Sequence, residues 1–199
     1  MDGRHIKDII KQLESNQREN TSFSCGTFEE MKYLLSNAFI ACDSTITKES
    51  FVWLQQYDQV AEWLSDTKGK GLLLTGNCGL GKTLLGRYII PTIFKSKLNK
   101  IVKWYHSKDS LNTKIANDMT WRKLISIDDI GSETFANNYG QKRYVIHDII
   151  LQAEDQNKTL ILTTNLNSEQ LTQKYDLRAV DRLLHNFKVV NLGNRESLR

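Results

Sequence analysis

The stretch Gly71–Thr83, GLLLTGNCGLGKT, decides the fold of this chain. It runs from an apolar segment straight into the pattern Gly76-x-x-x-x-Gly81-Lys82-Thr83. Glycines at these places let backbone N–H groups curl around phosphate oxygens, where a side chain would collide. A helix that starts near Gly81 adds its positive N-terminal end to the same anion. The stretch is therefore predicted to be a phosphate-binding loop between a buried strand and a helix.

The loop also supplies candidate ligands for a nucleotide. Lys82 is expected to reach the β- and γ-phosphates of ATP, and the Thr83 hydroxyl is expected to ligate Mg²⁺. Cys78 lies inside the loop, where it is either a small tolerated side chain or a site of oxidation. The residues predicted to surround ATP are Gly76, Asn77, Cys78, Gly79, Leu80, Gly81, Lys82, Thr83 and Leu84.

The composition is that of an ordinary globular domain. The 199 residues, 40% of them hydrophobic and 25% charged, suffice for one core with an extension. No apolar run approaches the ~20 residues of a membrane span, and the N-terminus has no secretory pattern. Three cysteines without metal-ligand spacing favour a reducing compartment. We therefore expect a cytoplasmic protein without a membrane partner, whose net charge of +4 permits nucleic-acid binding without demanding it.

The segment before the loop is predicted to be mostly helical. Residues 5–14 place isoleucines and a leucine on one helical face, and the polar residues 15–26 are typical of a linker. Thr27 and Glu30 have the spacing of a capping box, which predicts a helix that starts at Thr27. A further helix is expected from about 48 to 64, where apolar residues recur at helical spacing.

From residue 71 on, apolar strands alternate with helices. This alternation predicts an α/β fold with a five-stranded parallel sheet covered by helices on both faces. Pro91, the single proline, is expected to end or bend the helix after the loop near 89–90. We divide the chain into a short helical extension at 1–46, which can serve as a partner-binding arm, and a core at 47–199. The strands are predicted at 71–75, 101–105, 123–128, 159–164 and 187–191.

Two carboxylates end the third predicted strand. Mg²⁺ prefers oxygen ligands and keeps several waters, so Asp128 is predicted to hold the ion directly or through water. Asp129 is predicted to orient or deprotonate the water that attacks the terminal phosphate. Adjacent aspartates at a strand end can also simply begin a turn. Their place after the phosphate loop favours the catalytic interpretation.

A neutral amide follows the fourth predicted strand, in TLILTTN at 159–165. Asn165 can hydrogen-bond the γ-phosphate or position the attacking water without adding charge. The alternative is that Asn165 caps the next helix, although Ser168 is the better N-cap there. We favour the role in the site.

Two arginines, Arg178 and Arg182, share one helical face at a spacing of i and i+4. Asp181 can pair with Arg178, which is a purely structural explanation. An arginine presented to another molecule's phosphate is equally consistent, because a guanidinium stabilises the transition state of phosphoryl transfer. Residue chemistry alone leaves both alternatives open.

Aromatic residues beside basic residues form a separate pattern. The run KWYH at 103–106 is followed by Lys108, and WRK at 121–123 precedes the next predicted strand. Such runs suit stacking on single-stranded DNA and contact with its backbone. Because tryptophan and tyrosine at the ends of strands more often fill the edges of a core, the structural alternative stays open.

The ordered set GLLLTGNCGLGKT, ISIDDIGSE, LILTTN and KYDLRAVDRLL resembles the DnaC/IstB-like branch of the AAA+ ATPases. The resemblance covers residues 48–199 and rests most on the segments after the phosphate loop. It implies that Asp128 is the Walker B metal acid and that Asn165 is sensor 1. It also implies that Arg182 is the arginine finger, with Arg178 the second arginine of the same box, and that the sheet order is 5-1-4-3-2.

A function follows from this resemblance. The branch includes replicative helicase loaders and transposition helper ATPases. We therefore expect an ATPase that places a replicative hexameric helicase on single-stranded DNA and self-associates through its arginine finger. The alternatives are a transposition helper and, from other classes, a non-hydrolysing adaptor or regulator and a small-molecule kinase.

Two features depart from the pattern of that branch. Asp129 stands where many AAA+ relatives have glutamate. About eight residues follow the last predicted strand, so no full C-terminal lid is expected. A sensor 2 role can then fall only on Arg195 or Arg199.

Overall fold

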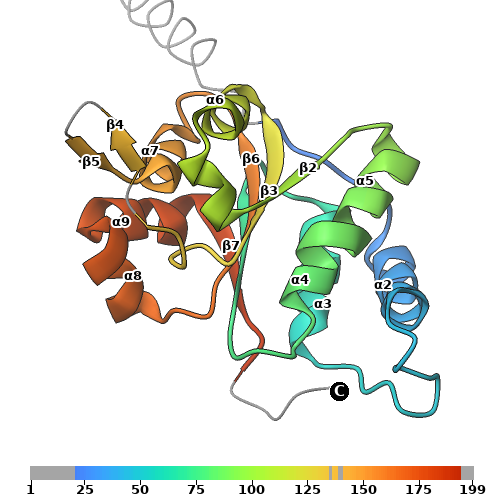
Figure 1. Ribbon diagram of the computed structural model, residues 1–199. Helices are drawn as coiled ribbons and strands as arrows, with labels where there is room; N and C mark the ends of the chain where they lie inside the picture. The colour runs from blue at the N-terminus through green and yellow to red at the C-terminus, as the bar shows by residue number, and fades with distance from the viewer. Residues whose placement is uncertain (1–20, 135, 139–140, 194–199) are drawn as a thin grey trace, which may run out of the picture.

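Five parallel strands form the central sheet of the protein (Figure 1). The computed structural model describes residues 21–134, 136–138 and 141–193. The strand order is β2-β3-β6-β1-β7, which confirms the expected order 5-1-4-3-2. The predicted helix at 5–14 and the candidate residues Arg195 and Arg199 lie outside the described residues. The strands are β1 (Gly71–Thr75), β2 (Lys103–His106), β3 (Leu124–Asp128), β6 (Thr159–Thr163) and β7 (Phe187–Asn191).

Helices cover both faces of this sheet, as predicted (Figure 1). A small antiparallel hairpin between β3 and α7, which the sequence analysis missed, consists of β4 (Ala136–Asn138) and β5 (Gln141–Arg143). None of the helices in the described ranges has the length and apolar character needed to cross a membrane. The first face carries α2 (Phe28–Cys42), α3 (Gln56–Ser65), α4 (Lys82–Leu84), the π-turn η1 (Leu85–Ile89) and α5 (Ile90–Leu98). The second face carries α6 (Thr113–Trp121), α7 (Val145–Gln152), α8 (Ser168–Tyr175) and α9 (Leu177–Asn186), with the 3₁₀ turn η2 (Ser107–Leu111) leading from β2 to α6.

The apolar strands are buried because both of their faces are covered. Leu72 and Leu74 of β1 pack in the core beneath α2 and α3, whereas Leu73 packs in the core beneath α7 to α9. The same alternation holds in β6, where Ile161 faces the first core and Leu160 the second. A continuous apolar run is therefore what a parallel strand between two helical layers requires.

The described part of the N-terminal segment packs against the sheet domain. Helix α2 begins after Thr27, whose side chain and that of Glu30 form the predicted capping box. Met31, Leu35 and Phe39 of α2 are fully buried in the first core. Residues 22–25, predicted as linker, are instead tied to residues 64–67 by backbone hydrogen bonds, and Cys25 is buried.

The predicted helix at 48–64 starts later than expected, because only its second half, α3, is helical. Thr47 and Ser50 exchange hydrogen bonds between their side chains and backbone N–H groups, at 2.8 Å and 3.2 Å, which holds this segment in a turn. The Phe51 N–H group also bonds to the Thr47 carbonyl oxygen, so residues 47–51 form one turn that is not continued before α3. Phe51 and Leu54 still pack in or against the first core. The apolar pattern therefore indicated burial correctly, although the predicted helix does not form at these residues.

The helix after the phosphate loop passes through Pro91 instead of ending before it. A proline lacks the N–H group, and its ring collides with the carbonyl oxygen four residues earlier in an α-helix. Here the turn before the proline widens to η1, in which the Ile90 N–H group bonds to the carbonyl oxygen of Leu85. The helix then continues to Leu98, so the local irregularity is a π-turn and not a helix end.

Candidate nucleotide-binding site

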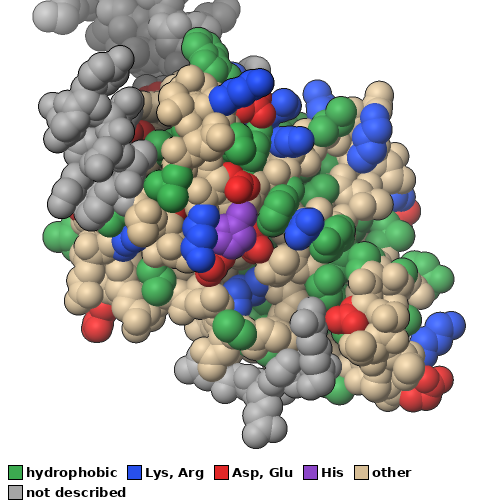
Figure 2. All heavy atoms as spheres, in the orientation of Figure 1, with side chains coloured by type: hydrophobic (Ala, Val, Ile, Leu, Met, Phe, Trp, Pro, Cys, Tyr) green, Lys and Arg blue, Asp and Glu red, His purple; other side chains and the backbone are tan. Residues whose placement is uncertain are grey.

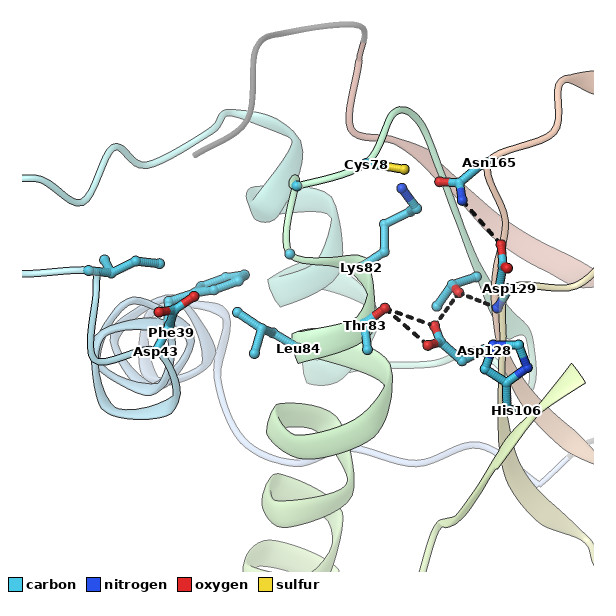
Figure 3. A pocket seen from close by; sticks show the side chains of 14 residues that line it. Phe39, Asp43, Cys78, Lys82, Thr83, Leu84, His106, Asp128, Asp129 and Asn165 are labelled. Atoms are coloured by element: carbon cyan, nitrogen blue, oxygen red, sulfur yellow. Dashed lines mark hydrogen bonds between the residues drawn. The ribbon is translucent and has the colours of Figure 1, made fainter. Parts of the chain in front are cut away.

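The phosphate loop folds tightly between β1 and α4 (Figure 3). Gly76, Gly79 and Gly81 all have positive φ, at 125°, 83° and 75°. Two constraints exclude a side chain at Gly81: its positive φ, and the ring of Phe39, which would lie 2.6 Å from a Cβ atom there. Leu80 is fully buried in the first core and so anchors the loop from below. The loop conformation therefore depends on the packing of α2 as well as on its glycines.

Lys82 lies inside the curl of this loop. Its Nζ atom donates hydrogen bonds of 2.6 Å to the carbonyl oxygens of Gly76 and Asn77. Burial lowers the pKa of the Lys82 ammonium, and the negative charges of Asp128 and Asp129 oppose that shift. The side chain points along the loop toward Cys78 and Asn165 (Figure 3). A cation is thus held where the phosphates of a nucleotide would enter.

Asp128 connects three elements of the site. Its carboxylate accepts hydrogen bonds from the Thr83 hydroxyl, at 3.0 Å and 3.2 Å, and from the Thr163 hydroxyl, at 2.5 Å. Asp128 is 6% exposed at the end of β3, Thr83 belongs to α4 and Thr163 ends β6. The predicted metal residues Thr83 and Asp128 are therefore brought into direct contact.

Asp129 is turned out of the strand direction by a left-handed backbone, with φ of 57°. Its N–H group donates to the Thr163 hydroxyl at 2.9 Å, and its carbonyl oxygen accepts from the Ser107 hydroxyl at 2.7 Å. Its side-chain oxygen accepts a hydrogen bond of 3.1 Å from Asn165 (Figure 3). Because a positive φ is uncommon outside glycine and must be supported by its surroundings, these contacts fix the direction of the carboxylate.

The structure brings Asn165 to the site and not to a helix end. The N-cap of α8 is Asn167, which forms a capping box with Gln170, so the expected cap at Ser168 is wrong by one residue. Asn165 is exposed and is left to interact with Asp129.

A pocket of about 380 Å³ joins these groups. Lys82, Thr83, Asp128, Asp129 and Asn165 line it together. The sequence analysis missed several lining residues that come from α2 and its following loop, from the end of β2 and from β6. The missed residues are Phe39, Asp43, Ile46, His106 and Thr163. For β2 and β6 the signal was available, because parallel strands end at the same edge of a sheet; for α2 no signal in the sequence indicates it.

The two candidate arginines differ in their surroundings on α9. The Arg182 guanidinium forms an ion pair with Glu154, which also accepts a hydrogen bond from Asn186. Arg178 is exposed, and its guanidinium contacts no charged partner among the described residues. The suggested partner Asp181 pairs with His185 instead. Neither arginine lines the pocket of its own chain.

The donor atoms at Thr83 and Asp128 suit a hard cation such as Mg²⁺. Both supply oxygen, and Mg²⁺ in nucleotide sites is commonly held by one or two protein ligands together with phosphates and water. Within the described ranges, no group of three or more His, Cys, Asp and Glu residues has the geometry to hold a metal ion by itself. The site therefore fits an ion that arrives with the nucleotide.

Sheet order, phosphate loop and acidic strand end together define an AAA+-type P-loop NTPase. The chain belongs to the family described as novel STAND NTPase 3, whose model matches residues 51–197. Among curated proteins, none matches the sequence significantly.

Several solved structures share the fold. They include AMPPCP-bound DnaA from Aquifex aeolicus, which is 16% identical with a TM-score of 0.54 over 75% of this chain and 50% of that chain. A putative primosome component from Streptococcus pyogenes serotype M3 is 20% identical with a TM-score of 0.50 over 64% and 71% of the two chains. At such identities these likenesses concern the fold alone.

The contact between Thr83 and Asp128 leads to a prediction for metal-dependent binding. Replacing Thr83 with valine removes the hydroxyl oxygen, so we expect Thr83→Val to weaken triphosphate binding in the presence of Mg²⁺ by about tenfold. Titration of a fluorescent ATP analogue, with Mg²⁺ and with EDTA, measures this effect. Thr83→Ser keeps the hydroxyl and should keep the Mg²⁺-dependent gain. Equal gains for the valine and serine variants would contradict the assignment.

Proposed function

We propose that this protein binds ATP with Mg²⁺ and hydrolyses it to ADP and phosphate in the cytoplasm. The observation that carries the proposal is the convergence of Lys82, Thr83, Asp128, Asp129 and Asn165 on one pocket. They come from the carboxyl ends of β1, β3 and β6 and from the first turn of α4. This edge is where open parallel sheets bind their ligands.

The binding roles follow from charge and position. Lys82 is assigned to the β- and γ-phosphates, since its ammonium lies inside the loop. Thr83 and Asp128 are assigned to Mg²⁺. The bound ion supplies positive charge to the phosphate oxygens. The backbone N–H groups of the exposed loop residues Cys78 and Gly79 are assigned to the remaining phosphate oxygens.

The hydrolytic role is assigned to Asp129. Its carboxylate accepts a proton from water as the water oxygen attacks the γ-phosphorus, and the bond from that phosphorus to the β–γ bridging oxygen breaks. The bridging oxygen leaves with its electron pair on ADP. Asn165, which donates to Asp129, is assigned to hold that carboxylate and to contact the water or the γ-phosphate.

A neighbouring copy of the protein is proposed to complete the site with an arginine. The resemblance to DnaC/IstB-like ATPases assigned this role to Arg182 and a supporting role to Arg178. The surroundings on α9 support the reverse, because Arg182 is engaged by Glu154 and Arg178 is exposed. Neither arginine lines the described pocket of its own chain, so the proposed role requires a second copy.

The biological role that we propose is loading of a replicative hexameric helicase on single-stranded DNA. The support is the combination ISIDDIGSE, LILTTN and KYDLRAVDRLL, which resembles the DnaC/IstB-like branch. The fold shared with DnaA and with a putative primosome component agrees with this role. A transposition helper is the nearest alternative. A kinase would require an acceptor substrate, and a non-hydrolysing regulator would bind ATP without turnover.

If Asp129 accepts the proton from water, a variant without this carboxylate should lose ATP hydrolysis but keep ATP binding. Asp129→Asn removes the proton acceptor but keeps the size of the side chain, so ATP hydrolysis should fall by about 10²-fold or more. Affinity for ATP should change little. Release of inorganic phosphate and equilibrium binding measure the two effects, with Asp155→Asn on the surface as the control. Unchanged phosphate release would remove the hydrolytic proposal and leave the non-hydrolysing regulator.

The arginine that acts from a second copy can be identified by mixing variants. Lys82→Ala protein is expected not to hydrolyse ATP in its own site, but it still carries both arginines for the site of a neighbouring copy. Mixed with Arg178→Ala protein, it should restore part of the ATPase activity that either variant lacks alone. Arg182→Ala should instead lower the thermal midpoint of unfolding, because it removes the half-buried ion pair with Glu154. If only the Arg182→Ala mixture regains activity, Arg182 is the finger.

The partner is tested by co-purification with the replicative helicase of the same source. We expect complex formation with wild-type protein, and a change in the amount of complex between ATP and ADP. The Lys82→Ala variant should lose the dependence on nucleotide. A helicase that fails to co-purify under every nucleotide condition would contradict the loader role while leaving the ATPase assignment intact.

A further inference from the structure

The outer edge of the sheet carries a groove that the nucleotide site does not use. β2 is the terminal strand on this side, and α6 packs beside it (Figure 1). In Figure 2, lysine and arginine side chains lie among hydrophobic ones over the upper part of this face, where α6, β2 and α5 are found. The groove has a volume of about 720 Å³ and is lined by Lys103, Trp104, Tyr105, Lys114, Ile115 and Trp121, with Asn117 and Asp118.

The aromatic residues of this region fall into two classes. Tyr105 is 4% exposed and donates a hydrogen bond to Asp118. Trp104 is half-buried and is covered by Arg87, whose guanidinium lies 4.2 Å from the ring centre. Trp121, at the end of α6, is 82% exposed. Trp121 is therefore the aromatic ring here that can accept a stacking partner without any rearrangement.

The groove is positively charged. Its carboxylate, Asp118, accepts hydrogen bonds from Tyr105 and from Arg122, and the ion pair with Arg122 offsets its charge. Lys103 and Lys114 are exposed and form no ion pair with the rest of the described chain. Two exposed lysines thus line the same groove as one exposed indole ring.

We propose that this groove binds single-stranded nucleic acid, with a base stacked on Trp121 and phosphates contacted by Lys103 and Lys114. Single strands present base faces and phosphates side by side, which suits a groove that combines an exposed ring with two lysines. A duplex hides its base faces, and an acidic peptide offers charge without the aromatic surface. Such a groove would supply the contact with single-stranded DNA that the proposed loader role requires, and its biological purpose rests on that proposed function. The contact itself requires no ATP.

The stacking contact is tested by fluorescence anisotropy with a labelled DNA oligonucleotide of about 16 nucleotides, in the absence of any nucleotide. We expect Trp121→Ala to lower the affinity about tenfold, because one base loses its stacking surface. Trp121→Phe should retain most of the affinity. Tyr33→Ala on α2, where the ring is 69% exposed, is the matched control and should bind like wild type.

The two lysines are tested through the salt dependence of binding. Each phosphate contact with a single strand contributes about 0.7 to the slope of log affinity against log salt. The double variant Lys103→Gln, Lys114→Gln should therefore have a slope about 1.4 smaller than wild type. The exposed pair Lys68→Gln, Lys70→Gln, placed before β1, should leave the slope unchanged.

The outcomes separate this proposal from the ATPase assignment. Wild-type affinity for Trp121→Ala, with an unchanged thermal midpoint, overturns the stacking site whatever the hydrolysis assays give. The same measurement is made with an RNA oligonucleotide of equal length, and Trp121-dependent binding of either nucleic acid supports the groove. Failure of wild-type protein to bind both oligonucleotides overturns the proposal, as does an acidic peptide that displaces the bound oligonucleotide at equal concentration.

Discussion

The carboxylate of Asp128 is the point at which the chemistry of the site depends on the topology of the sheet. It accepts hydrogen bonds from Thr83, behind the phosphate loop, and from Thr163, at the end of β6. These contacts exist because β6 pairs with both β1 and β3, which brings the three strand ends to one edge. A shift of one residue in β6 would turn Thr163 to the opposite face. Gly86 completes the arrangement, since a Cβ atom there would lie 3.1 Å from Ser126 on β3.

Two carboxylates and one ammonium group meet in the described part of the pocket. They belong to Asp128, Asp129 and Lys82. A triphosphate adds further negative charge, so its binding requires compensation from a metal ion and from the loop backbone. The Arg182 guanidinium cannot contribute within one chain, because Glu154 holds it on α9. An arginine from a second copy, as proposed above, would add positive charge beside the phosphates.

The extent to which the sequence predicts the structure differs between elements. The residue types of Gly71–Thr83 all indicate the same conformation, a phosphate loop whose glycines have positive φ. The sheet order also followed from the apolar runs and the family resemblance, whereas β2 lies at Lys103–His106 and not at the predicted 101–105. Residues 48–54 were assigned to a helix, whereas residues 47–51 form a single turn and α3 begins only at Gln56. Pro91 did not end its helix because a π-turn removed the conflict with the proline ring.

By itself the sequence determined which chemical groups are available: a phosphate loop, two adjacent acids, an amide and two arginines, each at the end or on the face of a recognisable element. Only the tertiary structure decided which of them meet. The Thr163 hydroxyl forms hydrogen bonds with both Asp128 and Asp129. The Phe39 ring packs against Gly81, and Glu154 holds Arg182 in an ion pair. In each case the contacting residues are distant in the chain. Such pairings depend on sheet order and helix packing, which local spacing does not encode. The same reason separates Trp121, left exposed, from the buried Tyr105 of a similar sequence run.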